Sequence, residues 1–156
     1  MKTILLSFNP KYYEPLKSGQ KKFEYRSRFS NEELKAYLYL SSPVRKIVAI
    51  IHFGKKIMLK TMLEDFSTDA DVCSRIKEYI YRYNKKYAVP ILRIEFLEPL
   101  SLDDIRIKVP GFMPPQSYKI IEDGTELQKL LSKINLTGKC IVMDHDNIEP
   151  NDICVN

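Results

Sequence analysis

Apolar and polar residues alternate along much of the chain in a way that predicts more strands than helices. Residues Lys2 to Phe8 are mostly apolar or β-branched and stop at Asn9-Pro10, which is typical of a buried strand followed by the start of a helix. That helix is expected to end at Ser18, because Gly19 can adopt the left-handed conformation of a helix terminus. The chain is therefore predicted to begin with a strand, a short helix and a tight turn.

The segment after this turn predicts a strand with one charged face. Residues alternate from Lys22 to Phe29, and successive side chains of a strand point to opposite sides. One side carries Phe23, Tyr25 and Ser27, and the other carries Lys22, Glu24, Arg26 and Arg28. The charged side chains are thereby set in a row.

The remaining pattern predicts strands interrupted by a few helices. Further strands are expected at 35–40, 45–53, 87–97 and 139–143, and helices at 58–66, 70–83 and 125–134. Gly54-Lys55-Lys56 indicates a hairpin turn, and residues 102 to 109 continue in β character before a proline-rich loop at 109 to 118. Pro90 indicates an edge position or a bulge within its strand. The pattern favours an α+β fold, a small mixed β-barrel with flanking helices.

Length and charge narrow this picture. The 156 residues, 44% of them hydrophobic, fit a single domain, with a core at roughly 3 to 120 and a C-terminal helix and acidic tail at 121 to 156. The net charge of +5 is uneven: residues 1 to 60 carry 13 basic and 4 acidic side chains, whereas residues 140 to 156 carry 4 acidic side chains and no basic one. This excess either solvates a surface or attracts an anionic partner.

Cysteine and histidine usage argues against a metal or disulfide protein. Three cysteines at long spacings and two histidines predict a reduced, cytoplasmic protein without a zinc site or other cofactor. Asp144-His145-Asp146-Asn147 offers ligand types, but such a cluster is usually a solvated turn. The chain shows no signal peptide and no apolar run long enough to span a membrane, so no membrane partner is expected.

The most informative stretch is the octet from Gly19 to Arg26. Gly19 permits a tight turn, Lys21 follows it, and Glu24 and Arg26 share one face of the predicted strand. If that face lines the mouth of a barrel, Arg26 or a lysine holds Glu24 in its ionised form. The alternative is a solvent-exposed pair of charges on an amphipathic strand, which contributes little energy.

The octet resembles the signature of the ASCH family, a branch of the PUA-like β-barrels, at Gly19, Lys21, Glu24 and Arg26. A second stretch, Pro114-Pro115-Gln116-Ser117-Tyr118, is similar to one found in some members of that family. The resemblance covers roughly residues 3 to 120. It implies a PUA-like barrel whose cleft, walled by the first helix and the strand from Lys21 to Arg26, accepts a nucleotide or an RNA segment.

The resemblance also implies two kinds of activity. Most members are proposed nucleic-acid-binding modules, some of them linked to transcriptional regulation. Certain small bacterial members are amidohydrolases that remove acetyl from acetylcytidine, with a lysine at the position of Lys21 as base and a threonine at the position of Glu24 as nucleophile. This chain departs from that pattern, because a carboxylate cannot act as the hydroxyl does.

As a binding module, the chain would hold nucleic acid, RNA rather than DNA, or a modified nucleotide, and would act in transcription or RNA regulation. Cations would contact phosphates, an aromatic ring such as Tyr25 would stack on a base, and polar side chains would contact its edge. The predicted binding set is Gly19, Lys21, Lys22, Glu24, Arg26, Arg28, Tyr39, Gln116, Ser117 and Tyr118.

As an enzyme, the chain would be a hydrolase of an acylated nucleoside or of RNA. Glu24 would activate water, and Lys21 or Arg26 would steady the developing oxyanion. A third hypothesis is an interaction module that docks a protein through its acidic tail or through the helix ending at Tyr83. The tail could also compete with a ligand for the cleft.

Overall fold

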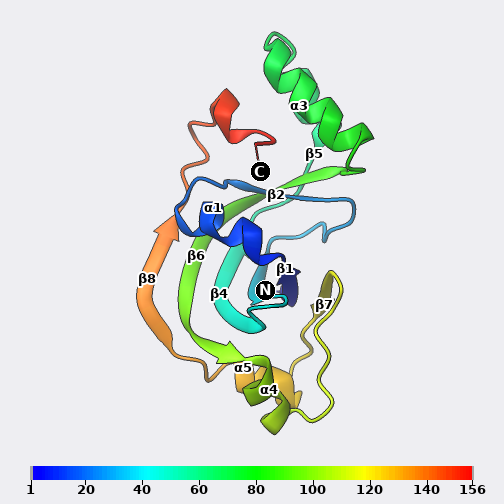
Figure 1. The fold of residues 1–156 in the computed structure, drawn as a ribbon. Helices are drawn as coiled ribbons and strands as arrows, with labels where there is room; N and C mark the ends of the chain where they lie inside the picture. Colours follow the sequence, from blue (N-terminus) through cyan, green and yellow to red (C-terminus); the bar gives the residue numbers. More distant parts are fainter. Residues whose placement is uncertain (1, 156) are drawn as a thin grey trace.

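The computed structural model describes residues 2–155 and shows a strongly curled sheet with helices at its two ends (Figure 1). The strands are β1 (Lys2–Phe8), β2 (Phe23–Arg26), β3 (Leu34–Leu40), β4 (Lys46–Phe53), β5 (Ile57–Met58), β6 (Tyr87–Ser101), β7 (Tyr118–Ile120) and β8 (Leu136–Val142). The helices are α1 (Tyr13–Lys17), α2 (Leu59–Asp65), α3 (Ala70–Tyr81), α4 (Leu102–Lys108) and α5 (Glu126–Leu131), with single 3-10 turns η1 (Pro10–Tyr12) and η2 (Pro150–Asp152).

Strand β6 organises the sheet. Its first half pairs antiparallel with β2 and β5, and its second half pairs with β4 on one side and β8 on the other. From β4 the sheet continues through β3 and β1 to β7, and β1 and β3 are parallel. The result is a mixed, half-closed barrel, and the predicted α+β class is confirmed.

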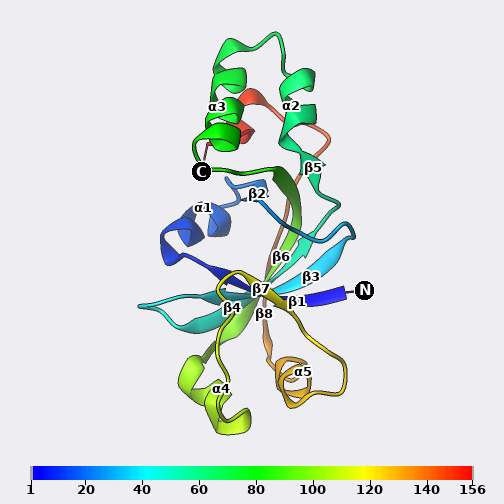
Figure 2. The ribbon, with the colours of Figure 1, turned by 90° about the vertical axis from the view of Figure 1, so that its right-hand side faces the viewer.

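Both faces of the central strands are buried, which explains their near-continuous apolar sequences. In β3, Leu38 points into a core inside the curl, while its neighbours Tyr37 and Tyr39 belong to a second core under α4 and α5. A third core lies between β2, α2, α3 and the C-terminal tail. Figure 2 shows the α2–α3 pair at one end of the sheet and α4 with α5 at the other.

The structure differs from the predicted elements in several details, among them that β2 ends at Arg26 and not at Phe29. Residues 102 to 108 form α4 rather than a strand, because the Ser101 side chain accepts a hydrogen bond from the Asp104 N–H at the helix start and Leu102 and Ile105 share a buried face. The residues after Phe53 do not form a hairpin, because the strand that follows pairs with β6 instead of β4.

Pro90 shows why a long strand can contain proline. It lies opposite Phe23 of β2, and its carbonyl accepts a hydrogen bond from the Gly54 N–H just beyond β4. The pairing of β4 with β6 shifts register at this point, between His52 and Phe53. The predicted bulge is therefore present, whereas the predicted edge position is wrong.

None of the helices in residues 2–155 combines the length and the apolar character that crossing a bilayer requires.

Candidate functional site

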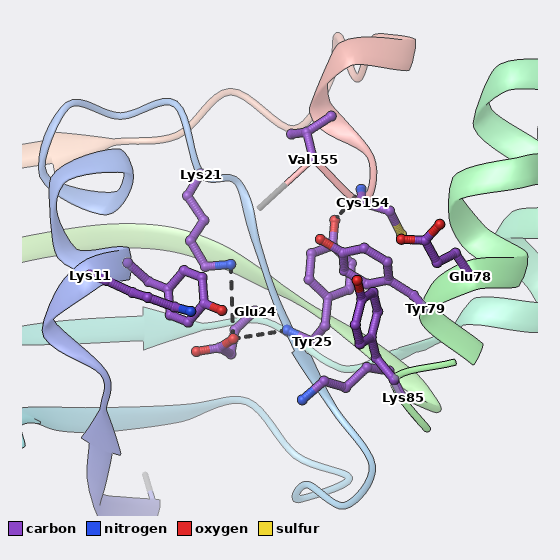
Figure 3. Close-up of a pocket in the computed structure, with 11 residues that line it drawn as sticks. Lys11, Lys21, Glu24, Tyr25, Glu78, Tyr79, Lys85, Cys154 and Val155 are labelled. Atoms are coloured by element: carbon purple, nitrogen blue, oxygen red, sulfur yellow. Dashed lines mark hydrogen bonds and ion pairs between the residues drawn. The ribbon is translucent and has the colours of Figure 1, made fainter. Parts of the chain in front are cut away.

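A pocket of about 620 Å³ opens between α1 and α3, next to β2, which forms the second half of the octet (Figure 3). Its walls come from four separate segments of the chain: η1, the turn and strand of the octet, the end of α3, and the tail. The lining residues are Lys11, Tyr12, Lys21, Glu24, Tyr25, Glu78, Tyr79, Tyr83, Lys85, Cys154 and Val155.

The end of α1 places Lys21 in the pocket wall. Gly19 takes the predicted left-handed conformation at φ +80°, and its N–H donates to the Leu16 carbonyl at 3.1 Å. The N–H groups of Gln20 and Lys21 both donate to the Pro15 carbonyl, also at 3.1 Å. The chain is thereby turned sharply into β2, with the Lys21 side chain directed at the space beside the strand.

Glu24 is the centre of a small charged cluster. Its Oε1 lies 3.9 Å from Lys21 Nζ and accepts a hydrogen bond of 3.0 Å from the Tyr25 N–H. Its Oε2 lies 3.7 Å from the Arg26 guanidinium. Lys21 is 4% exposed and Glu24 is 9% exposed, so this is not a solvent-exposed pair of the kind that contributes little. The Glu24 carboxylate is thus flanked by two cations in the wall of the pocket.

Burial lowers the pKa of the Lys21 amine. The positive charges of Arg26 and Lys85 lower this pKa further, whereas the Glu24 carboxylate opposes the shift. A lysine with a lowered pKa in a pocket gives up its proton more readily than a surface lysine, which suits it to acid–base chemistry.

Tyrosines line the pocket next to the charged cluster, and Lys21 Nζ lies 5.2 Å from the centroid of the Tyr25 ring. The Tyr25 and Tyr79 rings meet edge to face at 4.8 Å between centroids, and Tyr79 meets Tyr83 in the same manner at 5.8 Å. The Tyr25 hydroxyl accepts a hydrogen bond of 2.7 Å from the Cys154 N–H. Burial raises the pKa of both Tyr25 and Tyr79, so these phenols are protonated at neutral pH.

The structure brings the two predicted motifs together. Arg26 Nη1 donates to the Ser117 hydroxyl at 3.0 Å, and Nη2 donates to the Ser7 carbonyl at 3.3 Å. Gln116 is exposed beside this contact, and Tyr118 is half-buried with its ring against Phe29. The Pro-Pro-Gln-Ser-Tyr stretch therefore lies next to the octet, outside the set of residues that line the pocket.

Other predicted site residues lie farther from the pocket. Lys22 forms an ion pair with Asp152 of η2 at 3.2 Å, and Arg28 is exposed beyond the end of β2. Tyr39 is 3% exposed in the core under α4 and α5. These three side chains do not line the pocket that holds Lys21 and Glu24.

Sequence reasoning missed the walls supplied by α3 and the tail. Tyr79 and Tyr83 have helical spacing, which favours residues that pack a helix, yet both line the pocket. These two tyrosines lie four positions apart and are followed by Lys85 and Lys86, a pattern that indicates an aromatic and basic surface. Nothing in the sequence indicates that Cys154 reaches Tyr25, 129 positions away.

The acidic cluster near the C-terminus forms a local turn. The Asp144 carboxylate accepts from the Asp146 N–H and the Asn147 amide, and His145 is hydrogen-bonded to the Ile91 carbonyl at 2.7 Å. Within residues 2–155, no group of three or more His, Cys, Asp or Glu side chains is placed to hold a metal ion.

Comparisons with known proteins agree with this fold. No protein-family model matches the chain. A protein of Zymomonas mobilis called an ASCH domain-containing ribonuclease is 24% identical over 136 residues, which cover 84% of this chain and 91% of that protein.

Solved structures give the same result. The crystal structure of ASCH from Zymomonas mobilis superposes with a TM-score of 0.65 at 22% identity, covering 86% of this chain and 96% of that one. A Tyr-to-Phe variant of the same protein superposes with a TM-score of 0.62 at 20% identity, covering 86% and 100% of the two chains. The resemblance inferred from the octet is confirmed.

Proposed function

Because this chain has the fold of the ASCH domain, we propose that it is a ribonuclease, with the pair Lys21 and Glu24 as its acid–base machinery. One observation carries the proposal: a buried lysine and a buried carboxylate face each other in the wall of a pocket of nucleotide size. The name of the curated relative supports RNA as the substrate.

The chemistry of RNA fits the groups present. Glu24 takes the proton of a ribose 2′-hydroxyl, and the 2′-oxygen attacks the adjacent phosphorus as the bond from phosphorus to the 5′-oxygen breaks. Lys21 donates its proton to the leaving 5′-oxygen, and the products are a 2′,3′-cyclic phosphate and a 5′-hydroxyl. The proton that Glu24 took from the 2′-hydroxyl then passes through a water molecule to the Lys21 amine 3.9 Å away, which restores both groups. Arg26, 3.7 Å from Glu24, offers positive charge to the phosphate oxygens.

The identity of residue 24 favours RNA over acetylcytidine. An amidohydrolase of the kind that the resemblance implies needs a hydroxyl nucleophile, and the residues that line this pocket include neither serine nor threonine. RNA brings its own nucleophile in the 2′-hydroxyl, so a carboxylate base is sufficient.

The decisive experiment compares RNA and DNA as substrates in excess over the protein. We expect cleavage of end-labelled single-stranded RNA with 2′,3′-cyclic phosphate ends, no cleavage of DNA of the same sequence, and no release of acetate from acetylcytidine. The Glu24→Gln variant, purified in parallel, is expected to lose at least about 100-fold in rate, which excludes a contaminating nuclease. The matched control Glu122→Gln changes an exposed carboxylate beside a different hollow and should keep full activity.

Salt-dependent binding of RNA without turnover would contradict the proposed ribonuclease activity and would favour a nucleic-acid-binding module. Acetate release would favour the amidohydrolase. The expected roles in transcription or RNA regulation and the cytoplasmic location stay predictions.

A further inference from the structure

The C-terminal end of α3 is shaped to present an aromatic ring and a lysine to the pocket. The Tyr83 N–H donates to the Glu78 carbonyl at 3.2 Å, and the Lys85 N–H donates to the Tyr79 carbonyl at 2.9 Å. Between them Asn84 takes the left-handed conformation at φ +55°, which asparagine tolerates better than most residues. The chain therefore reverses here, and both Tyr83 and Lys85 line the cavity.

Two tyrosines keep free ring surface in this cavity. Tyr83 is 49% exposed and Tyr12 is 38% exposed, whereas Tyr25, which supports the wall behind them, is 5% exposed. Tyr83 stands edge to face on Tyr79, and Tyr12 stands edge to face on Phe8 at 6.3 Å between centroids. Each ring is thus held by a neighbouring aromatic ring and has a cation over it, Lys11 Nζ at 4.8 Å from the Tyr12 centroid and the Arg82 guanidinium at 5.6 Å from the Tyr83 centroid. The rest of the exposed ring surface is open to a ligand.

The two rings come from opposite walls of the same cavity. Tyr12 belongs to η1, beside α1, and Tyr83 follows α3. Burial raises the pKa of Tyr79, and the Tyr12 phenol raises it further. The hydroxyl groups on the two walls are therefore close enough to interact electrostatically. Lys11 and Lys85 also line the cavity and supply positive charge to it.

We propose that this cavity is a subsite for one unpaired nucleobase of an RNA strand, which stacks on Tyr83 with Tyr12 on the facing wall and Lys11 and Lys85 at the flanking phosphates. The inference rests on the proposed ribonuclease for one point only, that the phosphate next to this base lies at Lys21 and Glu24. A base in a duplex is already stacked on both sides and reaches such a pocket only by leaving the helix. The subsite therefore selects single-stranded RNA.

The test measures binding apart from cleavage. The probe is a single-stranded octamer of 2′-O-methyl uridines with one central 2-aminopurine, which lacks the 2′-hydroxyl and reports stacking through its fluorescence. We expect quenching on binding to the full-length protein, a dissociation constant raised about tenfold or more by Tyr83→Ala, and near-normal binding by Tyr83→Phe, which keeps the ring. Tyr81→Ala is the matched control, because Tyr81 is 75% exposed on the same helix and does not line the pocket.

An octamer of abasic 2′-O-methyl residues separates stacking from charge. It carries the same phosphates without bases, so we expect Tyr83→Ala to leave its weaker binding unchanged. Equal affinities of the wild type and Tyr83→Ala for the 2-aminopurine octamer, or equally tight binding of the same probe within a perfect duplex, would overturn the subsite. Stacking with the expected variant pattern, together with no cleavage of ordinary RNA, would support the subsite and overturn only the ribonuclease.

Discussion

Two hollows lined by described residues lie at opposite ends of the sheet, and they differ in what they bury. The pocket between α1 and α3 is lined by Lys21 and Glu24, both nearly inaccessible, and by tyrosines. The other, of about 400 Å³, lies beside β7 and the start of α5, and its floor is apolar, with Phe112 and Ile121 buried in it. Of its charged residues, Lys119 is half-buried and Glu122 is exposed.

This difference indicates where chemistry resides. Removing an ammonium and a carboxylate from water costs several kcal/mol per ion before their mutual attraction is counted. Such a pair therefore contributes little to the net stability of the fold. The apolar hollow carries no such cost. The expense of burying Lys21 beside Glu24 is understandable if the pair acts on a substrate, as proposed above.

The largest contrast is expected in activity. Lys21→Met keeps the length of the side chain and removes its proton donor, so we expect RNA cleavage to fall about 100-fold to 10,000-fold. Lys119→Met makes the same change beside the apolar hollow and should leave the rate unchanged. Initial rates at saturating RNA measure both. Equal rates for the two variants would mean that the buried pair has no catalytic part.

The second contrast concerns packing around the two hollows. Ile153 of the tail is fully buried against α2 and α3, so Ile153→Ala is expected to lower the free energy of unfolding by about 2–5 kcal/mol. Ile107 of α4 is 72% exposed, and Ile107→Ala should change it by less than about 0.5 kcal/mol. Urea denaturation followed by circular dichroism measures both values. Similar small losses would show that the tail is not part of the core.

The third contrast is in the response to alkaline pH. Burial raises the pKa of the Cys154 thiol to about 12 from an ordinary value of 9.0, so the folded protein holds this proton more tightly than the unfolded chain. The stability that this group contributes is complete below pH 9 and is lost as the pH rises toward 12, with a slope of at most about 1.4 kcal/mol per pH unit.

Two serine variants isolate this contribution. Cys154→Ser should flatten the loss of stability between pH 9 and 11, leaving the part due to other groups, among them Tyr25 and Tyr79, whose pKa values burial also raises. Cys140→Ser, at an exposed cysteine of β8, should leave the slope as it is. Thermal unfolding at half-unit steps of pH checks both, and identical slopes in the two variants would refute the assignment to Cys154.

Local signals in the sequence predicted the charged half of the pocket. Gly19, Lys21 and Glu24 are close in sequence, and a turn followed by a strand fixes their relative positions, so the octet was sufficient to place them in one site. The start of α4 also has a local signal, Ser101 with Asp104 three positions later, but the β-branched residues that follow are more typical of a strand.

The aromatic half could not be predicted because it depends on long-range packing. Tyr83 reaches the pocket only because α3 packs against β2 and the chain then reverses at Asn84. The tail reaches it only because Ile153 enters a core made by residues far earlier in the chain. Neither contact leaves a local pattern in the sequence.

The smallest contrast compares two ion pairs. Lys22 and Asp152, both less than one-fifth exposed, join the octet to the tail, whereas Lys129 and Glu126 form a well-exposed pair on α5. Asp152→Asn should lower the free energy of unfolding by up to about 1 kcal/mol, and Glu126→Gln by less than about 0.5 kcal/mol. Asparagine keeps an oxygen for the Glu149 N–H, so the loss reports the charge.

The same variant tests whether the acidic tail competes with RNA. Without its carboxylate partner, Lys22 is released to contact a phosphate, and RNA should bind a few-fold more tightly at low salt, with a steeper dependence on salt concentration. Glu126→Gln should change neither property, because α5 packs under the opposite end of the sheet. If Asp152→Asn binds RNA with unchanged affinity, the ion pair between Lys22 and Asp152 serves the packing of the tail alone, and RNA does not contact Lys22.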